Sequence, residues 1–142
     1  ALTRVTQATE AVIMADEPIH GVRDMLEVIR YQAADMVNIK LMKSGGLHAA
    51  RAMAELGLAA DIPCQIGSMV ESSVATLAGA HLAMAHCNIV ANDLVGPGMI
   101  SHDVADMPGS ETHIELSDAP GLGIRIDEER VRALSTFEDR VD

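Results

Sequence analysis

Short apolar runs recur along the first two thirds of the chain at a nearly constant spacing. Four such runs cover residues 11–15, 36–42, 62–66 and 88–94. Equivalent positions in them follow one another after 25, 25 and 27 residues, counted at Val12, Val37, Ile62 and Ile89. Each run is short and bounded by turn residues, which is typical of a buried strand. The spacing therefore predicts a repeated unit that contains one strand.

Helix-like patterns fill the intervals between the predicted strands. Apolar residues recur at helical spacing over 22–29, after the turn at Gly21, and again from Leu47 onward to Gly57, where we expect the helix to stop. A third, alanine-rich pattern covers 72–86. Apolar strands that alternate with helices indicate an α/β fold, in which helices cover a parallel sheet through right-handed crossovers.

Two α/β architectures fit this alternation, an open doubly wound sheet and part of a (β/α)8 barrel. A doubly wound nucleotide-binding fold has a glycine-rich turn after its first strand, whereas Asp16, Glu17 and Pro18 stand there in this chain. In a barrel, chemistry comes from the C-terminal ends of several strands, and each predicted strand here ends in polar residues. The pattern favours the barrel. A phosphate-binding doubly wound domain, supported only by Gly45 and Gly46, ranks behind it.

Four strands do not close a barrel, which averages about 250 residues, and the chain has 142. We therefore expect residues 1–100 to form half of a barrel within a larger enzyme. The repeat stops after 96–98 (Gly-Pro-Gly). Residues 101–142 carry a separate strand, turn and helix pattern, and we expect this tail to pack against a part of the protein outside this sequence.

Composition excludes several classes of partner. The net charge of −11 and the pI near 4.8 leave no basic surface for nucleic acid or for a membrane. No apolar stretch reaches the about 18 residues that a membrane-spanning helix needs, and we expect no signal peptide. Cys64 and Cys87 lie in apolar surroundings without metal-ligand or disulfide spacing, so we expect two buried free thiols and a cytoplasmic protein.

Two polar residues at predicted strand ends are the main candidates for chemistry. Asp16 suits either a helix N-cap or one ligand of a hard cation such as Mg²⁺. Alternation along 37–42 places Lys40 on the same face as Asn38 and Met42. Lysines are almost never buried without a partner. Lys40 is therefore either an edge residue that reaches solvent or a base whose pKa burial lowers, and we favour the base.

The other candidates lie after the strand that contains Lys40 or at the ends of later strands. Ser68 lacks the flanking pattern of a nucleophile elbow, so we expect it to make a backbone or substrate contact. Glu71 suits the first turn of the next helix, where the helix dipole favours a carboxylate. Asp93 ends the last strand, where capping and substrate contact fit the sequence equally. Lys43 is expected in solvent or at the start of a turn.

Five segments, in their order and spacing, resemble the C-terminal part of the enolase superfamily, in its muconate lactonizing enzyme subgroup. They are 12–18 (VIMADEP), 37–46 (VNIKLMKSGG), 67–72 (GSMVES), 93–97 (DLVGP) and 120–123 (PGLG). The resemblance implies that the four βα units are the last four of an enolase-type, TIM-like barrel, strands five to eight. It also implies that the tail returns to an N-terminal capping domain missing from this sequence.

The resemblance implies a chemistry as well. Asp16 would be the last Mg²⁺ ligand, and Lys40 one of two lysines that move the α-proton of a carboxylate substrate through an enediolate. The residues in contact with the small-molecule substrate would be Ser68, Met69, Asp93 and Val95. The second lysine and two further metal carboxylates would come from the N-terminal half of the same enzyme, which is the expected partner, and the enzyme is expected to be a homo-oligomer.

Two departures from the family pattern narrow this expectation. Gly67 and Ser68 stand where the mandelate racemase branch would have its histidine base. Dipeptide epimerases carry a second aspartate two residues after the position of Asp93, and Val95 stands there, as in cycloisomerases. We therefore expect an isomerase, either a racemase or epimerase of amino-acid derivatives or a muconate-type cycloisomerase. The alternatives are a dehydratase of the same superfamily and a non-catalytic barrel fragment that serves as a binding or assembly module.

Overall fold

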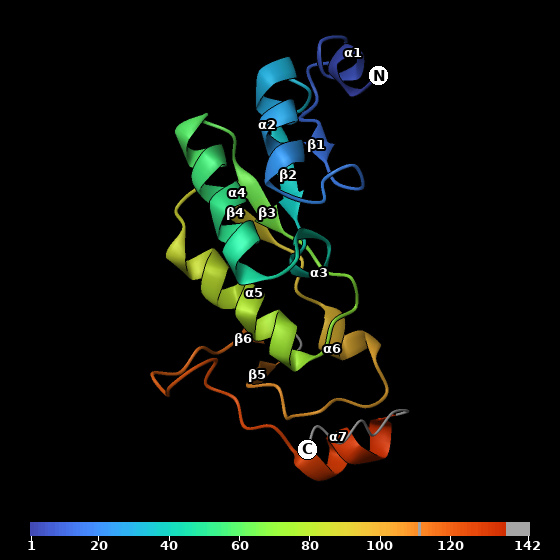
Figure 1. Ribbon diagram of the computed structural model, residues 1–142, viewed down its shortest axis with the longest axis vertical. Coiled ribbons are helices and arrows are strands. Elements are labelled where there is room, and N and C mark those ends of the chain that lie inside the picture. The colour runs from blue at the N-terminus through green and yellow to red at the C-terminus, as the bar shows by residue number, and fades with distance from the viewer. Residues whose placement is uncertain (111, 136–142) are drawn as a thin grey trace, which may run out of the picture.

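A four-stranded parallel sheet forms the centre of the computed structural model, which describes residues 1–110 and 112–135 (Figure 1). The strands pair in chain order and are β1 (Met14–Ala15), β2 (Met36–Ile39), β3 (Cys64–Ile66) and β4 (Ile89–Asn92). The helices that connect them are α2 (Val22–Tyr31), α4 (Leu47–Ala59) and α5 (Ser73–Ala85). Every strand and connecting helix of the predicted repeat is present, so the α/β prediction is confirmed.

The two faces of the sheet differ in chemistry. Helices α2, α4 and α5 lie side by side over one face (Figure 1). On that side the strands carry apolar side chains that are completely buried, among them Val37, Ile39 and Ile66. Asn38 and Gln65, which are opposite each other in β2 and β3, alternate to the other face. The sheet thus presents polar side chains on the face away from the helices.

The remaining elements are short. They are α1 (Leu2–Thr6), α3 (Leu41–Ser44), α6 (Gly96–Met99), the hairpin strands β5 (Gly109–Ser110) and β6 (His113–Ile114), and α7 (Glu128–Leu134). The hairpin and α7 lie at the opposite end of the molecule from α1 (Figure 1). Within the predicted tail of 101–142, residue 111 and residues 136–142 lie outside the described residues.

Strand β2 is shorter than the apolar run 36–42 predicted. The strand ends at Ile39, and the chain turns at once into α3. Lys40 keeps an extended backbone, with φ −118° and ψ 120°, and forms the N-cap of that helix. A run of apolar residues does not by itself distinguish the end of a strand from the start of a helix. The predicted alternation therefore holds as far as Lys40 and fails for Met42, which is exposed.

Gly57 does not end the second connecting helix, as the sequence suggested, because α4 continues to Ala59. The glycine serves close packing instead. A Cβ at this position would lie 2.9 Å from both Cys64 Sγ and Ile62 O, and 3.0 Å from Met25 Cε. Because residue 57 has no side chain, α4 can lie close to the start of β3 and to the side chain of Met25 in α2.

The two cysteines are free, but their surroundings are unlike. Cys64 is buried in β3, and burial raises the pKa of its thiol to about 11. Cys87 is exposed, so the expectation that both thiols are buried is wrong for this residue. Among the described residues, no helix has both the length and the apolar character needed to cross a membrane.

We expect Gly57→Ala to lower the free energy of unfolding of the complete protein by about 1–2 kcal/mol. Overpacking a close contact costs about 1–3 kcal/mol, and the better helix propensity of alanine offsets up to about 1 kcal/mol of that cost. Gly98→Ala is the matched control, because a Cβ there meets nothing within 4 Å. Urea unfolding followed by circular dichroism measures both variants. Equal stability of the two variants would show that α4 has room to shift.

Candidate active site

The polar residues predicted at the strand ends gather at one edge of the sheet. This follows from the topology, since the C-terminal ends of parallel strands meet at the same edge. The first residues beyond β1, β2 and β4 are Asp16, Lys40 and Asp93, and Ser68 is the second residue beyond β3. The edge therefore carries a carboxylate, an ammonium, a hydroxyl and a second carboxylate in strand order.

Asp16 and Lys40 form an ion pair where β1 and β2 end at this edge. Lys40 Nζ lies 2.9 Å from Asp16 Oδ1, and the two side chains are only 11% and 25% exposed. Lys43, from the first turn after β2, adds a second ammonium 3.5 Å from the same oxygen. Its Nζ also donates to the main-chain oxygens of Asp16, at 2.8 Å, and Glu17, at 3.2 Å.

Two residues of this cluster were not recognised as functional in the sequence. Lys43 was expected in solvent or at a turn, but it is mostly buried, and it ties the end of β1 to α3. Asn38 donates from Nδ2 to Asp16 Oδ2 at 3.1 Å. A polar residue inside an otherwise apolar strand, two positions before Lys40, was the available signal for Asn38. Nothing in the sequence near Lys43 indicated a contact 27 residues away.

The charges of the cluster stabilise one another. Burial alone would raise the pKa of Asp16, but the hydrogen bonds from Lys40 and Asn38 and the charges of Lys40 and Lys43 outweigh burial and hold that pKa below its ordinary value. The hydrogen bond to Asp16 raises the pKa of Lys40, against its own burial, and the negative charges of Asp16, Glu17 and Asp93 add to this effect. The expectation that burial lowers the pKa of Lys40 is therefore wrong for the chain as described. The carboxylate of Asp16 raises the pKa of Lys40 by more than burial lowers it.

The loop after β3 holds a second polar pair. Ser68 Oγ donates to Glu71 Oε2 at 2.6 Å and accepts from the Val70 amide at 2.9 Å. Glu71 is buried and precedes the N-cap Ser72, so its predicted place in the first turn of the helix is wrong. Val70 has a φ of +63°, a left-handed conformation that is rare for a β-branched residue and typical of functional loops.

The remaining predicted substrate contacts are accessible. Met69 is 44% exposed and Val95 is 50% exposed. Asp93 is also exposed, and its amide donates to Ile66 O at 2.8 Å, which fixes the chain as it leaves β4. Among the described residues, none of these three side chains has a hydrogen bond or ion pair with Asp16. The structure thus joins Asp16 and Lys40 directly and places the other candidates after β3 and β4, at the same end of the sheet.

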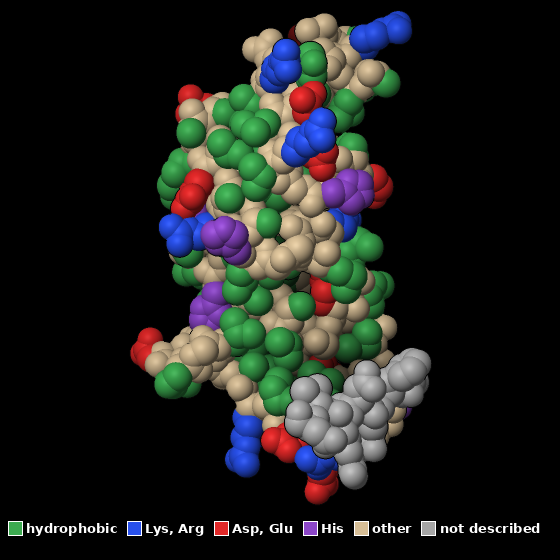
Figure 2. All heavy atoms as spheres, in the orientation of Figure 1, with side chains coloured by type: hydrophobic (Ala, Val, Ile, Leu, Met, Phe, Trp, Pro, Cys, Tyr) green, Lys and Arg blue, Asp and Glu red, His purple; other side chains and the backbone are tan. Residues whose placement is uncertain are grey.

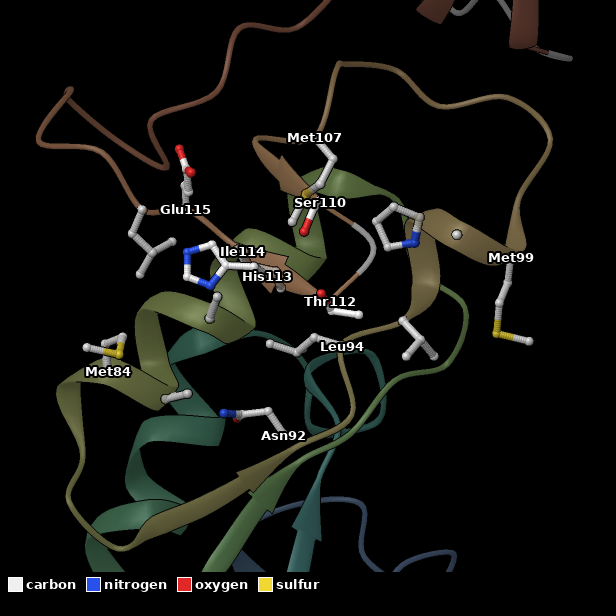
Figure 3. A pocket seen from close by; sticks show the side chains of 16 residues that line it. Met84, Asn92, Leu94, Met99, Met107, Ser110, Thr112, His113, Ile114 and Glu115 are labelled. Atoms are coloured by element: carbon white, nitrogen blue, oxygen red, sulfur yellow. The ribbon is translucent and has the colours of Figure 1, made fainter.

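A wide groove lies to one side of this ion pair. It has a volume of about 1280 Å³ between α5, α6 and the β5–β6 hairpin, and Val95, Leu94 and Met99 are among the residues that line it (Figure 3). Asp16 and Lys40 do not line it. The groove borders the predicted substrate position at Val95 but does not contain the ion pair.

The residues present fit one ligand of a hard cation. Asp16 Oδ1 is a buried carboxylate oxygen that faces the ammonium groups of Lys40 and Lys43, at 2.9 and 3.5 Å. A carboxylate oxygen of this kind suits Mg²⁺. No group of three or more His, Cys, Asp or Glu side chains that could hold a metal ion occurs within 1–110 and 112–135. The described chain therefore offers one strong ligand and not a complete metal site.

An acid from the tail holds the helix that follows the Ser68 loop. Asp103 Oδ2 accepts from the Ser73 amide at 2.8 Å, and Oδ1 accepts from Ser73 Oγ at 3.0 Å. The N-cap Ser72 makes no capping hydrogen bond with its own side chain. Asp103, 30 residues away in the chain, therefore accepts a hydrogen bond from a free amide at the start of α5. It also holds the backbone at the point where the 68–71 loop meets the helix.

The chain is similar to isomerases over nearly its whole length. A family model described as enolase C-terminal domain-like matches residues 1–130. N-succinyl-L-Arg/Lys racemase from Bacillus cereus is 40% identical over 99% of this chain and 38% of that protein. A crystal structure of this racemase matches 98% of the chain and 38% of its own, with a TM-score of 0.93. Chloromuconate cycloisomerase from Cupriavidus pinatubonensis is 33% identical over 100% of this chain and 39% of its own length.

A third relative was crystallised with a cation. The structure of a dipeptide epimerase from Cytophaga hutchinsonii, complexed with Mg and the dipeptide D-Ala-L-Val, matches 95% of this chain and 38% of its own, with 31% identity and a TM-score of 0.87. The chain thus spans less than two fifths of the length of the relatives it matches. These matches confirm the predicted fold, the C-terminal part of a TIM-like (β/α)8 barrel.

We expect Asp103→Ala to loosen the start of α5. Loss of a cap costs about 0.5–2 kcal/mol, and hydrogen exchange at residues 68–76 of the complete enzyme should accelerate accordingly. Asp24→Ala is the matched control, since Asp24 Oδ2 accepts a hydrogen bond from the His20 amide at the start of α2 and has no described contact with residues 68–76. If both variants left exchange at 68–76 unchanged, Asp103 would not determine the position of the loop.

Proposed function

The chain belongs to the enolase superfamily, in the group related to muconate lactonizing enzyme, and on this premise we propose that it forms part of the active site of a magnesium-dependent isomerase. The reaction would begin with removal of the proton α to the carboxylate of a small-molecule substrate, which gives an enediolate. One observation carries the proposal: a carboxylate and an ammonium, from Asp16 and Lys40, lie 2.9 Å apart at the ends of neighbouring strands.

Asp16 is the residue of this chain that would hold Mg²⁺, through the buried Oδ1 atom that faces the ammonium groups of Lys40 and Lys43. A bound Mg²⁺ would supply Lewis-acid stabilisation of the negative charge that develops on the substrate carboxylate. The dipeptide epimerase complexed with Mg supports this choice of cation. The other protein ligands would come from the N-terminal half of the enzyme.

Lys40 would move the α-proton at its Nζ. Its side chain is almost buried at the end of β2, with Asp16, Glu17 and Asp93 as the negative charges around it. These charges favour the ammonium, which is the form that donates a proton to carbon. A second lysine in the N-terminal half would act on the opposite side of the substrate. Removal of the proton on one side and its return on the other inverts the configuration at the α-carbon.

We propose N-substituted amino acids as the first substrate class and unsaturated diacids as the second. Asp93 offers one carboxylate, and the residue two positions on is the apolar Val95. A primary ammonium enclosed beside them would have one carboxylate partner, and an incompletely paired charge is costly to bury. An acylated nitrogen carries no charge. The relative named for N-succinylated amino acids supports the first class, and the chloromuconate cycloisomerase supports the second.

Two rival functions remain distinct from this proposal. A dehydratase of the same superfamily would start from the same enediolate and then expel a leaving group from the neighbouring carbon. A non-catalytic barrel fragment would use the Asp16–Lys40 pair only as a structural ion pair. The upstream sequence separates the catalytic functions from the non-catalytic one, because catalysis requires a Lys-x-Lys strand end and two strand-terminal carboxylates there.

The partner we propose is the N-terminal half of the same enzyme. In the described part of the chain, β1 and β4 each have one unpaired edge. Val12, Met84 and Val90 are highly exposed for apolar side chains, and Figure 2 shows hydrophobic side chains spread over the middle of one face. Open edges and apolar surface of this kind need cover. A homo-oligomer and a cytoplasmic location, which suits the two free cysteines, complete the proposal.

We expect Lys40→Ala in the complete enzyme to slow turnover by about 10²- to 10⁴-fold, because the variant lacks a general acid–base group. Exchange of the α-proton with deuterium from solvent, measured by mass spectrometry, should fall by a similar factor for the substrate enantiomer whose α-proton faces Lys40. It should persist for the enantiomer that the second lysine deprotonates. Binding of Mg²⁺ should survive, since Asp16 remains and loses a competing ammonium.

The control for this experiment is Arg51→Ala. Arg51 pairs with Glu55 on the exposed surface of α4, so its loss removes a cation without touching the site. Turnover should stay unchanged in this variant. Wild-type turnover in Lys40→Ala, together with wild-type deuterium exchange of both substrate enantiomers, would assign Lys40 a structural role and contradict the proposed mechanism.

Val95→Asp tests the substrate class. A second carboxylate beside Asp93 should improve pairing with a primary ammonium, so kcat/KM for dipeptides should rise relative to N-acylated amino acids and unsaturated diacids. Val95→Asn has nearly the same shape as the aspartate without its charge, and it should leave the ratio low. Both panels are followed by α-proton exchange, which assumes no particular product. Efficient epimerisation of dipeptides by the unaltered enzyme would refute the substrate assignment while leaving the role of Lys40 intact.

A further inference from the structure

Asn38 is a buried polar residue at the candidate site to which the proposed reaction gives no task. It lies in β2 with only 3% of its surface exposed. Its Nδ2 donates to Asp16 Oδ2 at 3.1 Å. Its Oδ1 is also buried and has no hydrogen-bond partner among the described residues. An amide that leaves half of its hydrogen-bonding capacity unused inside a protein costs stability, so packing alone does not account for this side chain.

Gly67, the first residue after β3, leaves the space that this side chain occupies. A Cβ on Gly67 would lie 2.4 Å from Asn38 Oδ1 and 2.5 Å from Asn38 Nδ2, far inside contact distance. Gly67 is absent from the glycines with positive φ, so its backbone conformation does not require a glycine. Its amide also donates to Ile39 O at 2.9 Å, which holds the two strand ends together here. The glycine is therefore explained by the carboxamide beside it.

Two separate contacts restrain Asp16. Lys43 binds the main-chain oxygens of residues 16 and 17 and so fixes the backbone at the end of β1. The side chain of Asp16 is held by charged groups at Oδ1, and the hydrogen bond from Asn38 is the uncharged contact that holds Oδ2. The other oxygen, Oδ1, is left on the side where the ammonium groups of Lys40 and Lys43 lie.

We infer that Asn38 is a positioning residue for Asp16. Its carboxamide, seated in the space left by Gly67, holds Oδ2 so that Oδ1 keeps the direction in which it meets a cation. This inference rests on the proposed function, in which Asp16 is a ligand of Mg²⁺. A carboxamide suits the task because its NH₂ group orients a carboxylate without bringing a positive charge that would compete with the cation.

The test uses the complete enzyme without substrate and measures the Kd for Mg²⁺ by titration calorimetry, together with the thermal midpoint. The variants are Asn38→Ala, Gly67→Ala and the double variant. Asn38→Ala should weaken Mg²⁺ binding by about 10- to 100-fold, as loss of a partner that orients a metal ligand does elsewhere. Gly67→Ala should weaken it as well, because the new methyl group displaces the carboxamide, and it should also lower the thermal midpoint.

The double variant separates positioning from packing. The methyl group of Ala at position 67 can occupy space that Asn38→Ala vacates, so the thermal midpoint should return toward that of Asn38→Ala alone. Mg²⁺ binding should stay weak, because no group then holds Asp16 Oδ2. Gly98→Ala, whose Cβ meets nothing within 4 Å, should change neither quantity.

Asp16→Asn in the same titration separates the role of Asp16 as a Mg²⁺ ligand from the positioning role of Asn38. If this variant binds Mg²⁺ as tightly as the unaltered enzyme, Asp16 is not a ligand and the proposed metal role fails together with the inference. If Asp16→Asn binds weakly but Asn38→Ala binds like the unaltered enzyme, only the positioning role is wrong. Recovery of Mg²⁺ affinity in the double variant would also overturn the positioning role, since packing would then be the whole contribution of the pair.

Discussion

Parallel pairing of β1 and β2 brings a carboxylate and an ammonium together, and the candidate site depends on this register. Ala15 stands opposite Val37, so the two strands end within a few residues of each other at one edge of the sheet. Asp16 and Lys40 are the residues that follow at that edge. The core on the helix side excludes charge, whereas the strand ends can hold charged groups that neutralise one another. The same geometry that builds the barrel fold therefore concentrates the chemistry.

The order of the elements could be predicted from the sequence, but their ends could not. Apolar runs at regular spacing are sufficient to predict strands that alternate with helices. Whether Leu41 extends β2 or starts a helix depends on the packing of α3 against α4 and α5, which no local pattern reveals. Gly57 shows the same limit, because a glycine that usually ends a helix is required here by the close approach of Ile62 and Cys64.

The positions of candidate residues could be predicted where they depend on a place along a strand. Asp16 and Lys40 each follow a strand, and the parallel fold brings them together. Lys43 and Asn38 act through contacts with Asp16, 27 and 22 residues away in the chain, which appear only once the strands are paired. Glu71 was expected in the first turn of α5 but lies two residues before Ser73, where the helix begins and where Asp103, from the tail, accepts from the first helical amide.

Because of Asp103, one end of the sheet depends on a residue that lies beyond the four βα units. Asp103 reaches back 30 residues to Ser73, so the backbone of the 68–71 loop is held by an acid that belongs to no βα unit. A chimera that takes residues 68–71 from one relative would keep the residue at position 103 of the other. The new loop would then meet an acid, or another residue, to which it is not matched. Loop and anchor therefore form a single module for engineering. A search for altered selectivity has reason to vary positions 101–104 together with the loop.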